Sequence, residues 1–181
     1  IHASADYRAA LDLFEQDQFA LAAAAFEKVA EGAKDPYVQA GATYQAAACH
    51  VKCDAFDKAK PLFVKTSSDL APYTQWEAES VFWLAHCHAF LLERDEAIAT
   101  LGRFLTDYAD AKERFRITAG QFKDQLAYRG ENELLDLSDR MTYVKRLLDK
   151  SKTDDPTQEK QKEIVDILDK LIKKHEDDCP T

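Results

Sequence analysis

One pattern of small and aromatic residues occurs three times along this chain and restricts the fold more than any other feature. In its clearest copy, Phe56 follows a turn, Ala59 comes three residues later and Phe63 four residues after that. Ala22 and Ala97 take the place of Ala59 in the other copies, 37 residues before it and 38 residues after it. A period of this length is typical of repeated helix-turn-helix units, in which a small residue lets two helices pack closely.

The composition favours an all-helical fold. Only five glycines and five prolines interrupt a 181-residue chain that is rich in Ala, Leu, Glu, Asp and Lys. Hydrophobic residues make up 46% of the chain, which is enough for a core. The length predicts one domain, or one domain with an appendage.

The three copies resemble the repeats of the tetratricopeptide repeat (TPR) family, whose units are about 34 residues long. Small pairs such as Ala46-Ala47 stand in the expected first helix of each copy, and Pro36 and Pro72 close the first two copies. The chain departs from the family pattern at the turn, where the glycine of the family is replaced. The replacing residues are Asp17, Asp54 and Leu92.

The resemblance implies an α-solenoid over residues 1–130. We expect repeats at about 5–36, 37–73 and 74–110, followed by a capping helix over 111–130 that ends a degenerate fourth unit. Gly130 is expected at the turn of that unit.

Residues 131–181 follow a different pattern, in which apolar residues recur at alternating steps of three and four. Such spacing is typical of a coiled-coil seam. Asp155 and Pro156 have the types that begin a helix, with Asp155 as the expected cap. We therefore predict a C-terminal helical, coiled-coil-like hairpin. Its last segment is similar to the tails of bacterial TPR proteins of unassigned function.

In the TPR family, one face of each first helix lines a groove for a protein partner, and the resemblance extends this role to nine residues. They are Tyr7, Leu11, Phe14, Tyr44, Val51, Lys52, Phe82, His86 and Phe90. Such an aromatic groove can bind an amphipathic helix or an extended peptide, or it can be covered by the chain's own tail or a neighbouring repeat. Lys52 is its one basic residue, which argues against binding of a terminal carboxylate.

Cysteine and histidine residues offer a different chemistry, a metal- or redox-linked role for Cys49, Cys53 and Cys87. Thiolates and an imidazole such as that of His86 are good zinc ligands. The spacing of Cys49 and Cys53 is not that of a zinc knuckle, and Cys49 and Cys87 equally suit positions that require small buried residues. A disulfide between Cys49 and Cys87 needs an unusually close helix crossing. Cys179 has no evident partner, and we expect no metal or cofactor.

The charge and the missing motifs limit the function classes. A net charge of −9 and a pI near 5.0 argue against nucleic acid and anionic membrane surfaces. The sequence contains no enzyme motif and no apolar run long enough to span a membrane. We therefore predict a non-enzymatic scaffold or adaptor that binds a protein or peptide. The alternative is a structural subunit that assembles with itself into a ring or filament.

The start of the chain bears on its location. It begins at Ile1 rather than Met, which a removed leader or a trimmed sequence would explain. Four cysteines suit an exported protein. The sequence assigns no location, and it slightly favours export, to a periplasm or outside the cell, over the cytoplasm.

Overall fold

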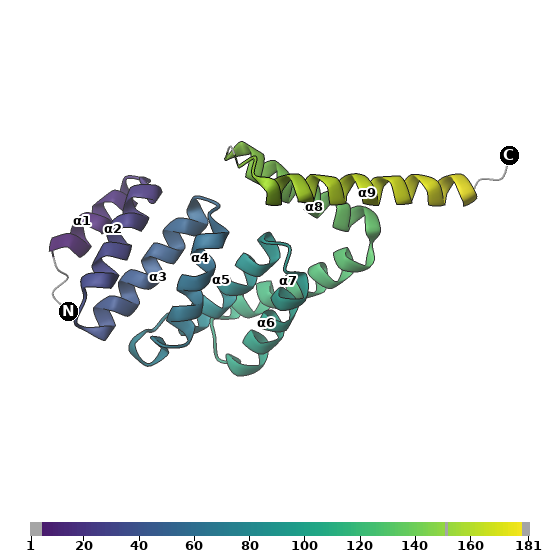
Figure 1. The fold of residues 1–181 in the computed structure, drawn as a ribbon. Helices are drawn as coiled ribbons and strands as arrows, with labels where there is room; N and C mark the ends of the chain where they lie inside the picture. Colours follow the sequence, from purple (N-terminus) through teal and green to yellow (C-terminus); the bar gives the residue numbers. More distant parts are fainter. Residues whose placement is uncertain (1–4, 151, 179–181) are drawn as a thin grey trace. The chain divides into compact units, whose positions relative to one another are not determined.

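The computed structural model describes residues 5–150 and 152–178, and every regular element among them is a helix (Figure 1). The elements are α1 (Ala5–Glu15), α2 (Phe19–Gly32), α3 (Pro36–Lys52), α4 (Phe56–Ser67), the 3-10 turn η1 (Ala71–Tyr73), α5 (Glu77–Phe90), α6 (Arg94–Asp107), α7 (Glu113–Glu131), α8 (Glu133–Asp149) and α9 (Asp155–Asp178). The all-helical prediction is thereby confirmed. None of these described helices combines the length and the apolar character needed to cross a bilayer.

The chain divides into two compact units, Ile1–Asp124 and Gln125–Thr181. The boundary falls inside α7, so this helix contributes to both. The units differ in how they bury apolar side chains.

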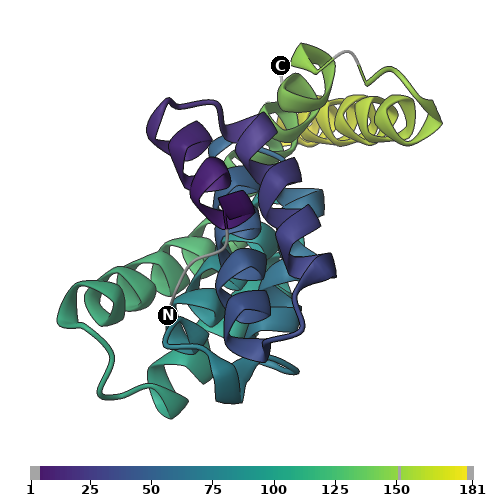
Figure 2. The ribbon, with the colours of Figure 1, turned by 90° about the vertical axis from the view of Figure 1, so that its left-hand side faces the viewer.

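In the first unit, each helix from α1 to α5 packs against the next one along the chain, so that α6 is the last of the series (Figures 1 and 2). Ala22, Ala59 and Ala97, the alanines of the repeated pattern, are fully buried. Phe26 and Phe63 are fully buried as well and fill the interior between successive helices. A residue without side-chain bulk at a helix contact permits the short interaxial distance that such packing requires.

Three turns of one geometry separate α1 from α2, α3 from α4, and α5 from α6. Their central residues, Asp17, Asp54 and Leu92, have φ angles of 56°, 54° and 64°. In each turn the N–H of the next residue donates to the carbonyl five positions back. These bonds are Gln18 to Leu13 at 3.0 Å, Ala55 to His50 at 2.8 Å and Glu93 to His88 at 2.9 Å.

This arrangement is the Schellman motif, in which the residue of positive φ is usually glycine. The N–H groups of Asp17, Asp54 and Leu92 complete it by donating to the carbonyls three positions back. A side chain at positive φ costs free energy because its Cβ approaches the backbone, and the cost is greatest for a residue such as Leu92 that cannot bond locally. Asp17, Asp54 and Leu92 therefore stand at the same position of one strained turn.

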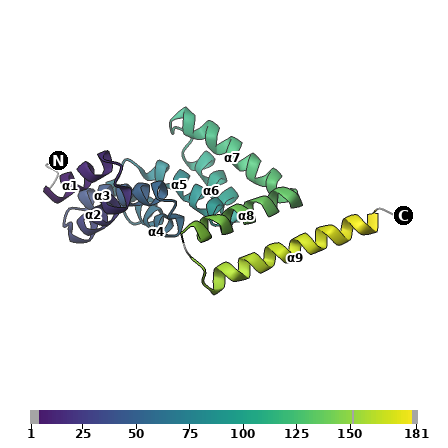
Figure 3. The same cartoon turned by 90° about the horizontal axis from the view of Figure 1, so that it is seen from above.

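The second unit contains α8 and α9, which run antiparallel in contact with one another (Figure 3). Arg140 Nη1 lies 3.4 Å from a carboxylate oxygen of Glu163, and Lys174 Nζ lies 3.3 Å from one of Glu133. Leu137 and Val144 are buried in α8. The second unit thus contains a helical hairpin with a narrow buried seam.

Two helix ends differ from the expectations. Gly130 lies inside α7 and not at a turn, because the break comes at Asn132. The Asn132 side chain accepts from the N–H groups of Leu134 and Leu135, both at 3.1 Å, and caps α8.

The cap of α9 is Asp154 and not Asp155. Asp154 Oδ1 accepts from the N–H of Thr157 at 3.3 Å and from its hydroxyl at 2.7 Å. A capping side chain accepts from the amide two or three residues on, and Asp154 has the three-residue spacing to Thr157. These hydrogen bonds lower the pKa of Asp154.

Candidate binding pocket

The nine residues predicted for the groove occupy several environments. Tyr44 and Phe82 are buried, and each contacts other aromatic rings. The Tyr44 ring stacks on Trp76 with centroids 5.0 Å apart, and its hydroxyl donates to a carboxylate oxygen of Glu79 at 3.1 Å. Phe82 meets Phe115 edge-to-face at 5.0 Å. These two side chains are therefore part of the interior of the first unit.

The predicted residues from α1 are partly buried against the following helices. Tyr7 contacts Phe26 edge-to-face at 5.4 Å, and Phe14 contacts Phe19 at the same distance. Leu11 packs against the buried cluster that includes Phe26. At the end of α3, Val51 packs against a buried cluster that includes Phe56 and Phe63. The Lys52 ammonium lies 6.0 Å from the centre of the Phe19 ring.

The remaining two predicted residues, His86 and Phe90, lie on α5. The His86 ring stacks on Phe122 of α7 with centroids 4.4 Å apart. Its Nε2 atom is buried and has no hydrogen-bond partner among the described residues. Burial lowers the pKa of His86 to about 4. Phe90 stacks on Phe56 at 4.3 Å and stays partly exposed. Through Phe122, α7 thus contacts one of the predicted groove residues.

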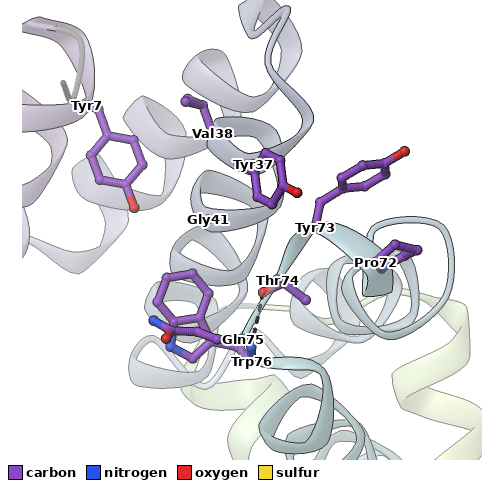
Figure 4. A pocket seen from close by; sticks show the side chains of 9 residues that line it. All are labelled: Tyr7, Tyr37, Val38, Gly41, Pro72, Tyr73, Thr74, Gln75 and Trp76. Atoms are coloured by element: carbon purple, nitrogen blue, oxygen red, sulfur yellow. Dashed lines mark hydrogen bonds between the residues drawn. The ribbon is translucent and has the colours of Figure 1, made fainter. Parts of the chain in front are cut away.

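A cavity of about 540 Å³ lies between α1, α3 and the segment that leads from η1 into α5 (Figure 4). Of the nine predicted groove residues, only Tyr7 contributes to it. The lining residues are Tyr7, Tyr37, Val38, Gly41, Pro72, Tyr73, Thr74, Gln75 and Trp76. We call this cavity the aromatic pocket.

Local structure sets the side chains around the aromatic pocket. Asp35 caps α3 by accepting from the N–H of Tyr37 at 2.9 Å, so Tyr37 lies in the first turn of that helix. Thr74 Oγ1 accepts from the N–H of Trp76 at 3.1 Å and holds the segment before α5. The indole of Trp76 is then fixed by its stacking on Tyr44.

Gly41 gives the pocket its depth. A Cβ atom at this position would lie 3.3 Å from the Tyr7 hydroxyl oxygen and 3.5 Å from the Trp76 ring. A larger side chain would therefore push these two groups or fill the space between them. Glycine at position 41 lets α1 and the segment before α5 approach the same turn of α3.

The rim of the pocket consists of two tyrosines, one from the first turn of α3 and one from η1 (Figure 4). Tyr37 and Tyr73 meet edge-to-face at 5.5 Å, and they are 56% and 38% exposed. Within the described residues, neither hydroxyl takes part in a hydrogen bond. Among the residues that the structure describes, no charged side chain lines the pocket. The pocket therefore offers apolar rings and hydroxyl donors to a neutral ligand.

The cysteines contribute no comparable site. Cys49 and Cys87 are fully buried free thiols, and Cys53 is partly buried. Burial, chiefly, raises the pKa of Cys49 to about 11 and that of Cys87 to about 12, so both thiols stay protonated near neutral pH. No group of three or more His, Cys, Asp or Glu side chains in residues 5–150 and 152–178 is arranged to hold a metal ion. Cys179 lies outside the described residues.

Two of the histidines beside these cysteines have acidic partners. His50 Nε2 lies 2.7 Å from Glu27 Oε1, and His88 Nδ1 lies 2.6 Å from Glu93 Oε2. Glu93 also accepts from the Lys60 ammonium at 2.7 Å. Through these contacts, His50 joins α3 to α2, and His88 joins α5 to the residue directly before α6.

The sequence contained one signal for the aromatic pocket. The dipeptide Pro-Tyr occurs at Pro36-Tyr37 and again at Pro72-Tyr73, 36 residues later. This interval is close to the repeat period, and the two tyrosines meet at the rim. Comparison of the chain with protein-family models, with curated proteins and with solved structures finds no match.

Proposed function

We propose that this chain is a TPR-like repeat protein whose first unit is an α-solenoid, and that it acts as a non-enzymatic module for binding another protein or a peptide. The spacing of the three Schellman turns supports the repeat assignment, because Asp17, Asp54 and Leu92 follow the same 37- and 38-residue steps as the buried alanines. Partner binding through a repeat scaffold needs no catalytic group, only a shaped surface.

The observation that carries the functional proposal is the aromatic pocket. Exposed aromatic side chains around a concavity are unfavourable in water, and on folded proteins they mark binding sites. Tyr37 and Tyr73 are exposed at the rim of a cavity of about 540 Å³, and none of the described residues that line it is charged. A volume in this range suits a short peptide segment or a small ligand.

Selection from a random peptide library displayed on phage tests this proposal. We expect the full chain to enrich peptides that bind it and that do not bind the double variant Tyr37→Ala/Tyr73→Ala. Tyr128→Ala removes a tyrosine that is 64% exposed and does not line the pocket, so it serves as the matched control. Failure to enrich any peptide, or enrichment of peptides that bind the double variant equally well, would contradict the proposal.

A specific observation favours the second candidate, self-assembly. In α8, Leu134, Met141 and Leu148 recur at steps of seven and are exposed. In α9 a matching exposed stripe consists of Val165, Leu168 and Ile172. Two helices in contact with each other bury only the seam between them, and a second hairpin can cover both stripes as a four-helix bundle.

Light scattering of the full chain tests self-assembly. Met141→Glu and Ile172→Glu place a charge in each apolar stripe, and both should lower the mass in solution if copies associate through the hairpin. Gln161→Glu adds the same charge at an exposed polar position of α9 and should leave the mass unchanged. A full chain that is monomeric at high concentration would leave the peptide-binding proposal standing alone.

A further inference from the structure

We infer that the aromatic pocket binds a proline-containing segment in the extended polyproline II conformation. This inference rests on the proposed function and names the ligand class. The pocket is defined by the rings of Tyr7, Tyr37, Tyr73 and Trp76 and by Gly41 at its floor.

The rings give the first reason. A proline side chain is a compact apolar ring, and aromatic-lined grooves recognise it because the polyproline II segment is already ordered before it binds. Tyr37 and Tyr73 stand edge-to-face at the rim, and Trp76 is fixed deeper by its stacking on Tyr44. Because the Trp76 ring is already held by Tyr44, little conformational entropy is lost at this ring when a ligand binds.

Hydrogen bonding gives the second reason. A polyproline II backbone forms no internal hydrogen bonds, so its carbonyl groups are available as acceptors. The hydroxyls of Tyr37 and Tyr73 are not engaged within the described part of the chain, and both can donate to such carbonyls. A proline nitrogen carries no hydrogen, so a proline-rich segment needs donors from its receptor more than acceptors.

Size and charge argue against the other kinds of peptide. An amphipathic helix is about 10–12 Å wide and needs anchors over several turns, whereas a cavity of about 540 Å³ holds only a few side chains. The pocket lacks a charged lining residue in the described part of the chain, so a charged anchor side chain would lose its hydration without gaining an ion pair there. The net charge of −9 would repel an acidic segment, so a neutral or basic segment is favoured.

Isothermal titration of the full chain with acetylated and amidated decaproline tests the inference, with a Gly-Ser decapeptide as the matched peptide control. We expect saturable binding of decaproline and none of the control. Tyr37→Ala and Tyr73→Ala should each weaken binding about tenfold or more, as expected for aromatic anchors at a binding site. Tyr37→Phe keeps the ring and removes the donor, so it should weaken binding about two- to tenfold. Tyr128→Ala should bind like the unchanged chain.

The outcomes separate this inference from the function on which it rests. Peptides selected from the random library that need Tyr37 and Tyr73, together with no binding of decaproline, would overturn the ligand class and leave the proposed function intact. Decaproline binding that Tyr37→Ala and Tyr73→Ala leave unchanged would also overturn the inference. Absence of any peptide that depends on these tyrosines would overturn both. Circular dichroism of each variant checks that it is folded.

Discussion

Both units of this protein are built from helices, but they bury their apolar residues very differently. In the first unit, alanines and phenylalanines such as Ala59 and Phe63 are fully buried where successive helices meet. In the described residues of the second unit, the buried apolar side chains are Leu126, Leu137 and Val144. A helical pattern therefore does not by itself produce a core, because most helical stability in proteins comes from packing an apolar face against another surface.

The polar contacts of the second unit do not replace this burial. Its ion pairs, such as Lys160 with Glu163 at 2.7 Å, lie at the surface and join partly exposed side chains. Pairs of this kind contribute about 0–1 kcal/mol each. We therefore expect the first unit to hold most of the stability of the chain, and the following variants test this comparison.

The largest effect is expected at Phe63 in α4. Phe63→Ala leaves a cavity in a fully buried site and should lower the free energy of unfolding by about 3–5 kcal/mol. Lys162→Ala, at an exposed position of α9, should change it by less than about 0.5 kcal/mol. Urea denaturation followed by circular dichroism measures both. Equal effects at the two sites would refute the contrast between the units.

Acid should weaken the first unit through His86. Burial lowers the pKa of His86 from 6.5 to about 4, because aromatic rings such as Phe122 surround the imidazole in place of water. Between these two pH values the unfolded chain binds more protons than the folded one, so the free energy of unfolding falls as the pH is lowered. The fall should reach about 3 kcal/mol near pH 4.

The variant His86→Phe isolates this contribution, since it keeps an aromatic ring and removes the titrating group. Its stability should depend less on pH between 4 and 6.5 than that of the unchanged chain. Hydrogen exchange read separately for α5 and for α9 then locates the effect. A pH dependence that is the same in both proteins would show that another group is responsible.

A smaller effect is expected from adding bulk at a helix contact. Ala59→Leu overpacks a fully buried position and should lower the free energy of unfolding by about 1–3 kcal/mol. Ala24→Leu makes the same change at an exposed position of α2 and should stay within about 0.5 kcal/mol. Thermal shifts of similar size for the two variants would mean that Ala59 is not at a close helix contact.

The smallest effect is a gain in stability. Leu92 has a φ of 64°, which glycine adopts without steric cost, so Leu92→Gly should raise the free energy of unfolding by about 0.5–1 kcal/mol. Leu91→Gly, at the neighbouring residue with a φ of −93°, should lower it. The melting temperatures of the two variants give the comparison, and a loss at position 92 would show that the burial of its side chain outweighs the strain.

Local features of the chain were the most predictable. The sequence predicted turns at Asp17, Asp54 and Leu92, and the structure has a Schellman turn at each. The start of α9 was misassigned by one residue, because Asp154 and Asp155 have the same side chain and only the hydrogen bond to Thr157 distinguishes them. Gly130 was expected at a turn, yet it lies inside α7 because Asn132 supplies the cap.

The candidate site was much less predictable than the helices. Of the predicted groove residues, Tyr7 lines the aromatic pocket, whereas Tyr44 does not line it and contacts one of its lining residues, Trp76, by stacking. Tyr37, Tyr73 and Trp76 were not predicted as binding residues, because they lie at the junctions between the expected repeats, outside the helix faces from which the groove was inferred. The repeated Pro-Tyr dipeptide was the signal that could have indicated them.

The sequence by itself determined the helices, the spacing of the turns and the alanines at helix contacts. These depend on backbone preferences and on periodicity over a few residues, which a single chain displays directly. Only the tertiary structure decided which aromatic side chains are covered and which remain open. Phe122 stacks on His86, 36 positions earlier in the chain. The Tyr7 hydroxyl and the Trp76 ring both lie close to Gly41. Contacts between residues so far apart along the chain depend on how helices pack, and no local pattern specifies them.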